Sequence, residues 1–234
     1  MLFRSRQWRG LEQATVLLTL LDHKPAAPRF VALLSNDRPE VYVAAAWGLR
    51  KLAVKETLPE VAEHVAKTWK LFEGKWDPLK SRVDWIEHRL SQLNQFMGQQ
   101  KYRAADAVLR QFIPKRMDGI LAEARAAAVW SLGLIHEGEG DAGLASALEA
   151  RLLDTAGPPP EDARVRRMSA VTLGRLHAKS ALPTFRKFCP TLVLGQDPIY
   201  NSCVWAINQI TGEPIQPPPT SQVVRRDWFL TPEQ

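Results

Sequence analysis

The stretch Ile120–Ile135, ILAEARAAAVWSLGLI, is the clearest copy of a pattern that recurs along the chain. Alanine, the strongest helix former, fills five of its positions, so the stretch predicts a helix. Ala128, Leu132 and Ile135 follow the spacing of a buried helix face, and Arg125 is expected to point away from it. A lone helix of this kind cannot bury its apolar stripe, so it needs copies of itself on both sides.

The copies are marked by pairs of leucine or isoleucine three residues apart. Successive pairs begin 31, 41, 42, 41 and 34 residues after one another. Two positions before the first member stands Trp47, Trp130 or Trp205 in three of the units. We expect these tryptophans to pack against the adjacent repeat, and a base-stacking platform for nucleic acid is the alternative interpretation. The pairs are Leu18/Leu21, Leu49/Leu52, Leu90/Leu93, Leu132/Ile135, Leu173/Leu176 and Ile207/Ile210.

A second helix is predicted between successive pairs. Pro28, Pro59 and Pro183 each fall ten residues after the first member of a pair. Proline is tolerated in the first turn of a helix, where its missing N–H would be unpaired anyway, so each proline marks a helix start. Ala142 takes this place in the fourth unit, and Tyr102–Phe112 gives the second helix of the third.

The pattern predicts an all-α, right-handed superhelix, an α-solenoid of about six helix-pair units over residues 1–212. Residues 213–234 are expected to form an extended, Pro-rich C-terminal tail. In this tail Trp228, Phe229 and Leu230 are expected to cover the open end of the array. The units lie near residues 10–36, 38–72, 77–114, 120–155, 161–190 and 199–212.

Composition restricts the class of protein. Of 234 residues, 45% are hydrophobic and 24% charged, as in an ordinary folded domain. The net charge of +6 favours anionic partners, although a basic solvated surface explains it as well. Cys189 and Cys203 are too few for a disulfide framework, which favours a reducing, cytoplasmic compartment. No membrane span is expected, and Glu12 interrupts the short apolar run that would otherwise resemble a secretory leader.

Two stretches, RAAAVWSLGLI at 125–135 and RRMSAVTLGRL at 166–176, resemble the first helices of the HEAT-repeat family. They are similar to its shorter phycobilin-lyase-type variant, and WAINQITGEP at 205–214 looks like the terminal repeat of many bacterial HEAT proteins. The resemblance covers about residues 10–212. It implies an α-solenoid whose second helices line a concave face, and a scaffolding role that the fold alone does not fix.

No catalytic constellation is found, and no metal or cofactor is predicted. The pair His136-Glu137 resembles the His-Glu pairs of the HEAT-like deoxyhypusine hydroxylases, but that family needs four such pairs and this chain has one in that order. We therefore expect His136 and His177 to cap helix C-termini. Asp77 and Asp84 beside tryptophans are similar to features of HEAT-like alkylpurine DNA glycosylases, without a match to their catalytic segment.

The sequence thus predicts a non-catalytic scaffold that binds a protein partner along its concave face. Nucleic-acid binding through a basic concave face is the alternative, and a lyase or metal-dependent enzyme on the same scaffold is a third. The oligomeric state stays open. The predicted partner-binding residues, most of them basic side chains of the second helices, are Lys67, Lys70, Trp76, Arg103, Arg110, Arg151, Arg186 and Lys187.

Overall fold

The computed structural model describes residues 2–72, 83–116 and 120–217, and this part of the chain is an all-α, solenoid-like stack of helices. Its one regular β contact is an isolated parallel bridge between Val193 and Gln216. The main helices are α1 (Leu2–Leu20), α2 (Ala27–Leu33), α3 (Pro39–Leu52), α4 (Leu58–Lys70), α5 (Val83–Gln99), α6 (Asp106–Arg110), α7 (Ala122–Ile135), α8 (Ala142–Leu153), α9 (Ala163–Arg175), α10 (Leu182–Phe188) and α11 (Pro198–Thr211). Short 3-10 turns precede several even helices, at Lys24–Ala26, Lys55–Thr57, Arg103–Ala105 and Lys179–Ala181.

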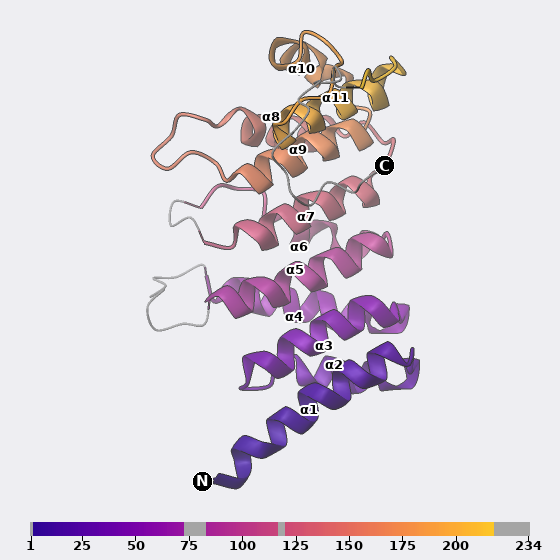
Figure 1. Cartoon of the computed structure of the whole chain (residues 1–234), viewed down its shortest axis with the longest axis vertical. Helices are drawn as coiled ribbons and strands as arrows, with labels where there is room; N and C mark the ends of the chain where they lie inside the picture. The colour runs from indigo at the N-terminus through magenta and orange to yellow at the C-terminus, as the bar shows by residue number, and fades with distance from the viewer. Residues whose placement is uncertain (1, 73–82, 117–119, 218–234) are drawn as a thin grey trace, which may run out of the picture.

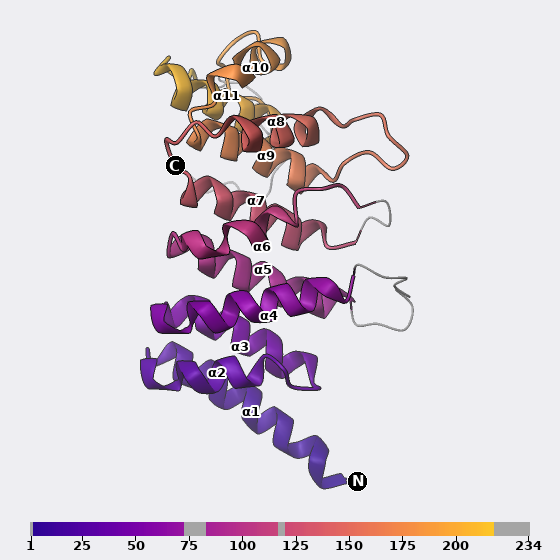
Figure 2. The ribbon, with the colours of Figure 1, turned by 180° about the vertical axis from the view of Figure 1, so that it is seen from behind.

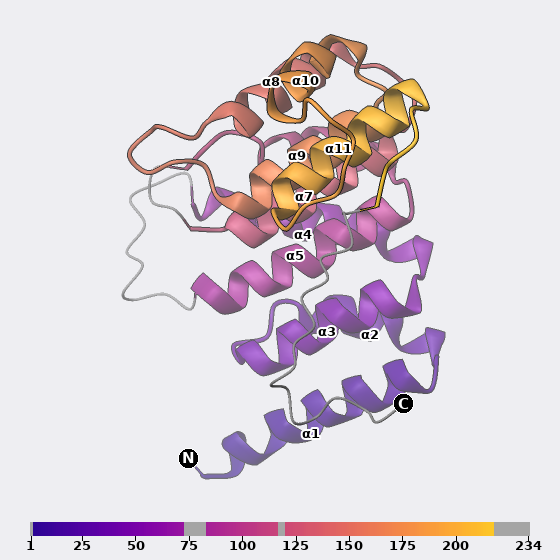
Figure 3. The same cartoon turned by 45° about the horizontal axis from the view of Figure 1, so that its top comes forward.

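The helices form two layers. The odd-numbered helices lie side by side in one layer, which we call the odd-helix layer, and Figure 1 shows them in chain order from bottom to top. The even-numbered helices form the even-helix layer on the other side, which faces the viewer in Figure 2. The tilted view of Figure 3 shows α7, α9 and α11 stacked over one another. No described helix combines the length and apolarity that crossing a bilayer requires.

The predicted start signals are confirmed. Pro28, Pro59 and Pro183 each lie in the first two positions of an even helix. Helix α8 begins at Ala142, and the Asp141 carboxylate caps it by accepting a hydrogen bond from the Leu144 N–H at 2.9 Å. The expected cap and start of the third unit, Asp77 and Pro78, lie outside the described residues, as do the tail residues 218–234.

The Leu/Ile pairs lie between the layers, as their spacing predicts. Leu49, Leu90, Leu132 and Leu173 are at most 1% exposed. The first pair differs, because Leu21 is 68% exposed. Helix α1 stands at the end of the odd-helix layer and packs against α3 on one side only. Because α1 has a neighbouring odd helix on one side, fewer of the apolar side chains in this unit are covered.

Small residues allow the odd helices to touch through their backbones. A Cβ atom added to Gly98 of α5 would lie 2.6 Å from the Cα of Ser131 in α7, and one added to Gly174 of α9 would lie 2.8 Å from the Cα of Ala206 in α11. These distances are shorter than any real carbon contact, so side chains larger than hydrogen do not fit there. The glycines at these two positions therefore serve close helix packing.

Four arginines, here called the capping arginines, bind the C-terminal ends of the first four even helices. A helix leaves its last four carbonyl groups without partners, and cations are favoured beside them. Each capping arginine comes from another part of the chain and donates to a carbonyl in the last turn of an even helix or within two residues after its end. The pairs are Arg89 to the Leu34 oxygen at 2.7 Å, Arg116 to Phe72 at 3.2 Å, Arg125 to Phe112 at 3.1 Å and Arg166 to Leu152 at 3.0 Å.

Arg125 corrects the expectation that its side chain points away from the buried face. It is 2% exposed and forms a bidentate ion pair with Glu161, with N–O distances of 2.8 and 2.7 Å. Glu161 lies after the Gly157–Pro160 break, so the ion pair ties that loop to α7. Arg151 adds a longer contact to the same carboxylate at 3.4 Å. The Arg125 and Glu161 charges can be buried together because each neutralises the other.

We expect Arg125→Met to lower the free energy of unfolding by about 3–5 kcal/mol, because it leaves the Glu161 carboxylate buried without its main partner. The double variant Arg125→Met/Glu161→Leu should regain part of that loss. Urea unfolding followed by circular dichroism measures both. Arg167→Met, on the exposed surface of α9, is the matched control. A single variant as stable as this control would contradict the assigned role.

A second prediction concerns His64 on α4, whose pKa is lowered to about 4 by burial and by the positive charges of Arg89 and Lys67. As the pH falls from about 6.5 to about 4, the unfolded chain binds a proton at this residue that the folded state does not, so stability falls by roughly 2 kcal/mol. His64→Gln should remove this part of the pH dependence. Comparison of urea midpoints for both proteins near pH 7 and about pH 4.5 tests this. Parallel losses in the two proteins would refute it.

Candidate partner-binding face

Two cavities open on the odd-helix layer. The first cavity has a volume of about 410 Å³ and lies at α1, α3 and α5. The second cavity, of about 300 Å³, lies at α5, α7 and α9. Both fall in the size range of ligand pockets, and apolar side chains dominate their walls. Their lining residues are Glu12, Val16, Glu40, Val43, Ala44, Trp47, Trp85 and Gln92 in the first, and Ser91, Gln95, Glu123, Ala126, Ala127, Trp130, Arg164 and Met168 in the second.

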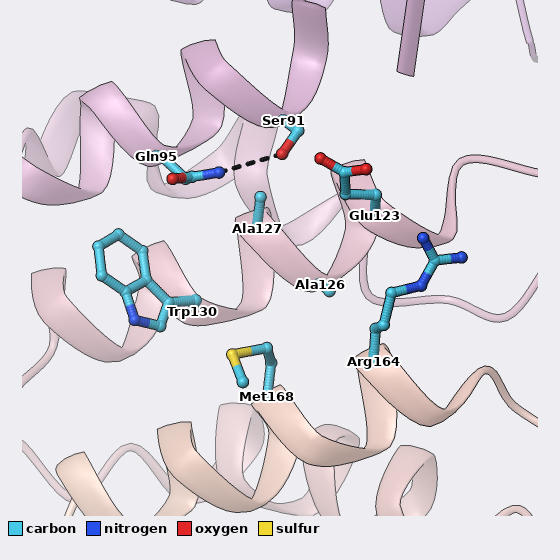
Figure 4. A pocket seen from close by; sticks show the side chains of 8 residues that line it. All are labelled: Ser91, Gln95, Glu123, Ala126, Ala127, Trp130, Arg164 and Met168. Atoms are coloured by element: carbon cyan, nitrogen blue, oxygen red, sulfur yellow. Dashed lines mark hydrogen bonds between the residues drawn. The ribbon is translucent and has the colours of Figure 1, made fainter. Parts of the chain in front are cut away.

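Figure 4 shows the arrangement of the second cavity. Trp130 stands at one end, and the charged side chains of Glu123 and Arg164 stand at the other. Met168 of α9 faces the pair Gln95–Ser91 of α5 across the opening, where the Gln95 amide donates to the Ser91 hydroxyl at 3.1 Å. The cavity therefore offers an aromatic wall and a polar rim to an incoming group.

The two cavities are the same structural feature repeated two units apart. Glu40, Val43, Ala44 and Trp47 of α3 correspond to Glu123, Ala126, Ala127 and Trp130 of α7, each pair 83 residues apart. Trp85 and Met168 are related by the same interval. Sequence reasoning did not select these cavities, although the shared Glu-x-x-[Val/Ala]-Ala-x-x-Trp spacing is visible in the chain and was the available signal.

The tryptophans are therefore only partly packing residues. Trp205 fits the expectation, because one of its ring carbons lies 2.9 Å from the position of a Cβ atom on Gly174. Trp47 and Trp130, half-buried like Trp205, stand at cavity walls. The guanidinium of Arg175 lies 5.2 Å from the centre of the Trp130 ring and donates to the Trp130 carbonyl at 3.4 Å, which holds the ring in place.

Electrostatics differ between the two cavities. At the second, the Glu123 carboxylate is 3.4 Å from His88, and the Glu123 backbone N–H donates to Glu87 at 2.5 Å. Burial raises the pKa of Glu87, and the hydrogen bond from Glu123 opposes the rise. Arg164 adds a cation to the same rim. The second cavity thus contains one cationic side chain, Arg164, which also pairs with Asp162 at 3.0 Å.

The basic residues predicted to bind a partner lie on the even-helix side, and most are engaged with carboxylates of the chain itself. Lys67 is 2.7 Å from Glu63, and Arg110 is 2.8 Å from Asp106 and 2.7 Å from Asp141. The remaining ion pairs are Arg103 with Glu139, Arg151 with Asp154 and Glu161, and Arg186 with Glu213. These pairs reduce the positive potential that the predicted stripe would present to an anion.

The remaining predicted partner-binding residues differ in where they lie. Lys70 and Lys187 are exposed on the even-helix side, and Trp76 lies outside the described residues. Among the other tryptophans, Trp69 is 8% exposed and packs on Phe112 with ring centroids 4.3 Å apart. Trp85 is 42% exposed and lines the first cavity, so of these two tryptophans it is the one placed to meet a ligand.

His136 ends α7, as expected of a capping residue, and its ring also joins a network of carboxylates. One ring nitrogen is 2.6 Å from Asp106 and the other is 2.6 Å from Glu139. A hydrogen bond from Arg103, together with one from His136, lowers the pKa of Glu139 to about 2. Within the described ranges, no group of three or more His, Cys, Asp or Glu side chains is arranged to hold a metal ion.

Comparison with known proteins adds no family assignment. No model of a known protein family matches the chain, and a search of curated protein sequences gives no significant match.

Proposed function

We propose that this chain is a HEAT-like, non-catalytic scaffold that binds an extended or helical segment of a protein partner along its odd-helix layer. The observation that carries the proposal is the pair of repeat-related cavities, each with a half-buried tryptophan beside small apolar residues. Tryptophan and arginine anchors set in pockets commonly dominate the affinity of protein interfaces. The chain departs here from the resemblance, which implies a binding face on the second helices.

The spacing of the cavities limits the length of the bound segment. Neighbouring packed helices lie about 8–10 Å apart, so cavities centred on α3 and α7 lie roughly 16–20 Å apart. A helix rising about 1.5 Å per residue covers this span with about 11–13 residues. An extended strand at about 3.3 Å per residue needs about five or six. A single short segment with two anchoring side chains is therefore sufficient to fill both cavities.

Nucleic-acid binding has less support. Its motivation was the net charge of +6 and the basic side chains of the second helices. Five of these side chains form ion pairs within the chain, at Lys67, Arg103, Arg110, Arg151 and Arg186. A phosphate backbone would have to break those pairs, whereas a protein segment in the cavities would leave them intact. We further propose a cytoplasmic setting, in line with two buried cysteines that carry free thiols.

The proposal predicts that partner capture depends on the odd-helix layer. Affinity capture from the native lysate would compare the unaltered chain, Trp47→Ser/Trp130→Ser, and Lys70→Glu/Lys187→Glu. We expect the tryptophan pair to abolish recovery of the partner, because both anchoring pockets lose their aromatic wall. The charge-reversal pair, on exposed residues of the even-helix side, should leave recovery unchanged. Circular dichroism confirms that all three proteins fold, and partner loss in the charge-reversal pair alone would overturn the proposal.

A further inference from the structure

The first cavity contains hydrogen-bond acceptors that lack donors. Among the described residues, the Glu40 Oε2 and Gln92 Oε1 atoms are buried and accept no hydrogen bond. The other Glu40 oxygen has a long contact to the Arg38 guanidinium, at 3.6 Å. A buried polar atom without a partner destabilises a protein, and more so when it is charged. Both atoms belong to side chains that line the cavity, so a donor placed in the cavity would lie beside side chains with unused acceptors.

The remaining lining residues suit a donor that carries positive charge. Glu12 adds a second carboxylate, and Trp47 and Trp85 provide two indole rings. The face of an indole attracts cations, and a carboxylate beside it strengthens the preference. Val16, Val43 and Ala44 supply apolar surface for the alkyl stem of a long side chain. No lining residue of this cavity is basic.

The second cavity provides an internal contrast. Its glutamate, Glu123, occupies the position of Glu40 but already faces His88, and Arg164 contributes a cation to the lining. Met168 replaces Trp85 at the corresponding position. The lining of the second cavity therefore includes a cationic side chain, whereas the lining of the first cavity includes none. This difference lies in the side chains and not in the helices that carry them.

We propose that the first cavity binds the cationic side chain of a basic peptide segment, arginine in preference to lysine. The planar guanidinium can stack on an indole ring while its N–H groups reach Glu40 and Gln92 together, whereas an ammonium is a compact point charge. This inference rests on the proposed scaffold function and specifies one anchor of its partner. The apolar or aromatic anchor in the second cavity would then lie roughly 16–20 Å away along the segment.

The test uses single residues as probes of the intact chain. N-acetyl-arginine amide, N-acetyl-lysine amide and the neutral isostere N-acetyl-citrulline amide are titrated into ¹⁵N-labelled protein, with the tryptophan indole N–H signals as the readout. Trp47→Phe and Trp85→Phe assign the two signals. We expect arginine amide to shift both signals, lysine amide to shift them less, and citrulline amide to leave them unchanged. Equal shifts with citrulline amide, or shifts confined to other tryptophans, would overturn the inference.

A matched pair of variants identifies the acceptor. Glu40→Gln should weaken arginine-amide binding about tenfold or more, because a charge-assisted hydrogen bond is lost. Glu60→Gln makes the same change in the first turn of α4, on the even-helix side, and should have no effect. Unchanged binding by Glu40→Gln would reject the site. If arginine amide fails to bind while partner capture still requires Trp47 and Trp130, the arginine site is rejected and the scaffold function stands. If arginine amide binds but partner capture does not require Trp47 and Trp130, the proposed scaffold function is rejected and the arginine site stands.

Discussion

The structure depends on guanidinium groups that close the C-terminal ends of the even helices. Three of the described even helices, α2, α6 and α10, have seven residues or fewer, and short helices leave a large share of their carbonyl groups unpaired. Arg89, Arg125 and Arg166 reach from odd helices, and Arg116 from the segment after α6, to donate to those carbonyls. The last unit uses another group for a similar contact, because the Tyr200 hydroxyl donates to the Thr191 carbonyl just after α10. The two layers are thus joined by polar contacts as well as by the Leu/Ile core.

This arrangement separates the tasks of the two layers. On the even-helix side, charged side chains are used within the chain, for example in the Arg110 contacts to Asp106 and Asp141. On the odd-helix layer, backbone contact at glycines brings the helices together, while larger residues such as Trp47 and Trp130 stand at the edges of cavities. The odd-helix layer, in which helices contact one another through their backbones, therefore also contains the two cavities. Binding there requires no rearrangement of the ion pairs on the opposite side.

The fold could be predicted because its determinants are local and periodic. The Leu/Ile pairs and the prolines at helix starts act within one helix, so their meaning does not depend on distant partners. Arg125 shows where this reasoning ends. Helical spacing gave its position on α7, but its burial depends on Glu161, 36 residues away beyond a proline-rich loop. The ion pairs of the basic residues on the even helices escaped the same reasoning, since the carboxylates that contact them come largely from neighbouring units.

The candidate site required comparison between units as well as within them. A tryptophan precedes the Leu/Ile pair in the second and fourth units, but His88 and Val171 occupy that position in the third and fifth. A cavity of this kind uses three consecutive odd helices, with the tryptophan on the middle one and a large side chain, Trp85 or Met168, from the next. Alternation of the tryptophans therefore places the two cavities two units apart and separates them in space. A period of two units favours a partner with two distinct anchors over one that contacts every repeat equally.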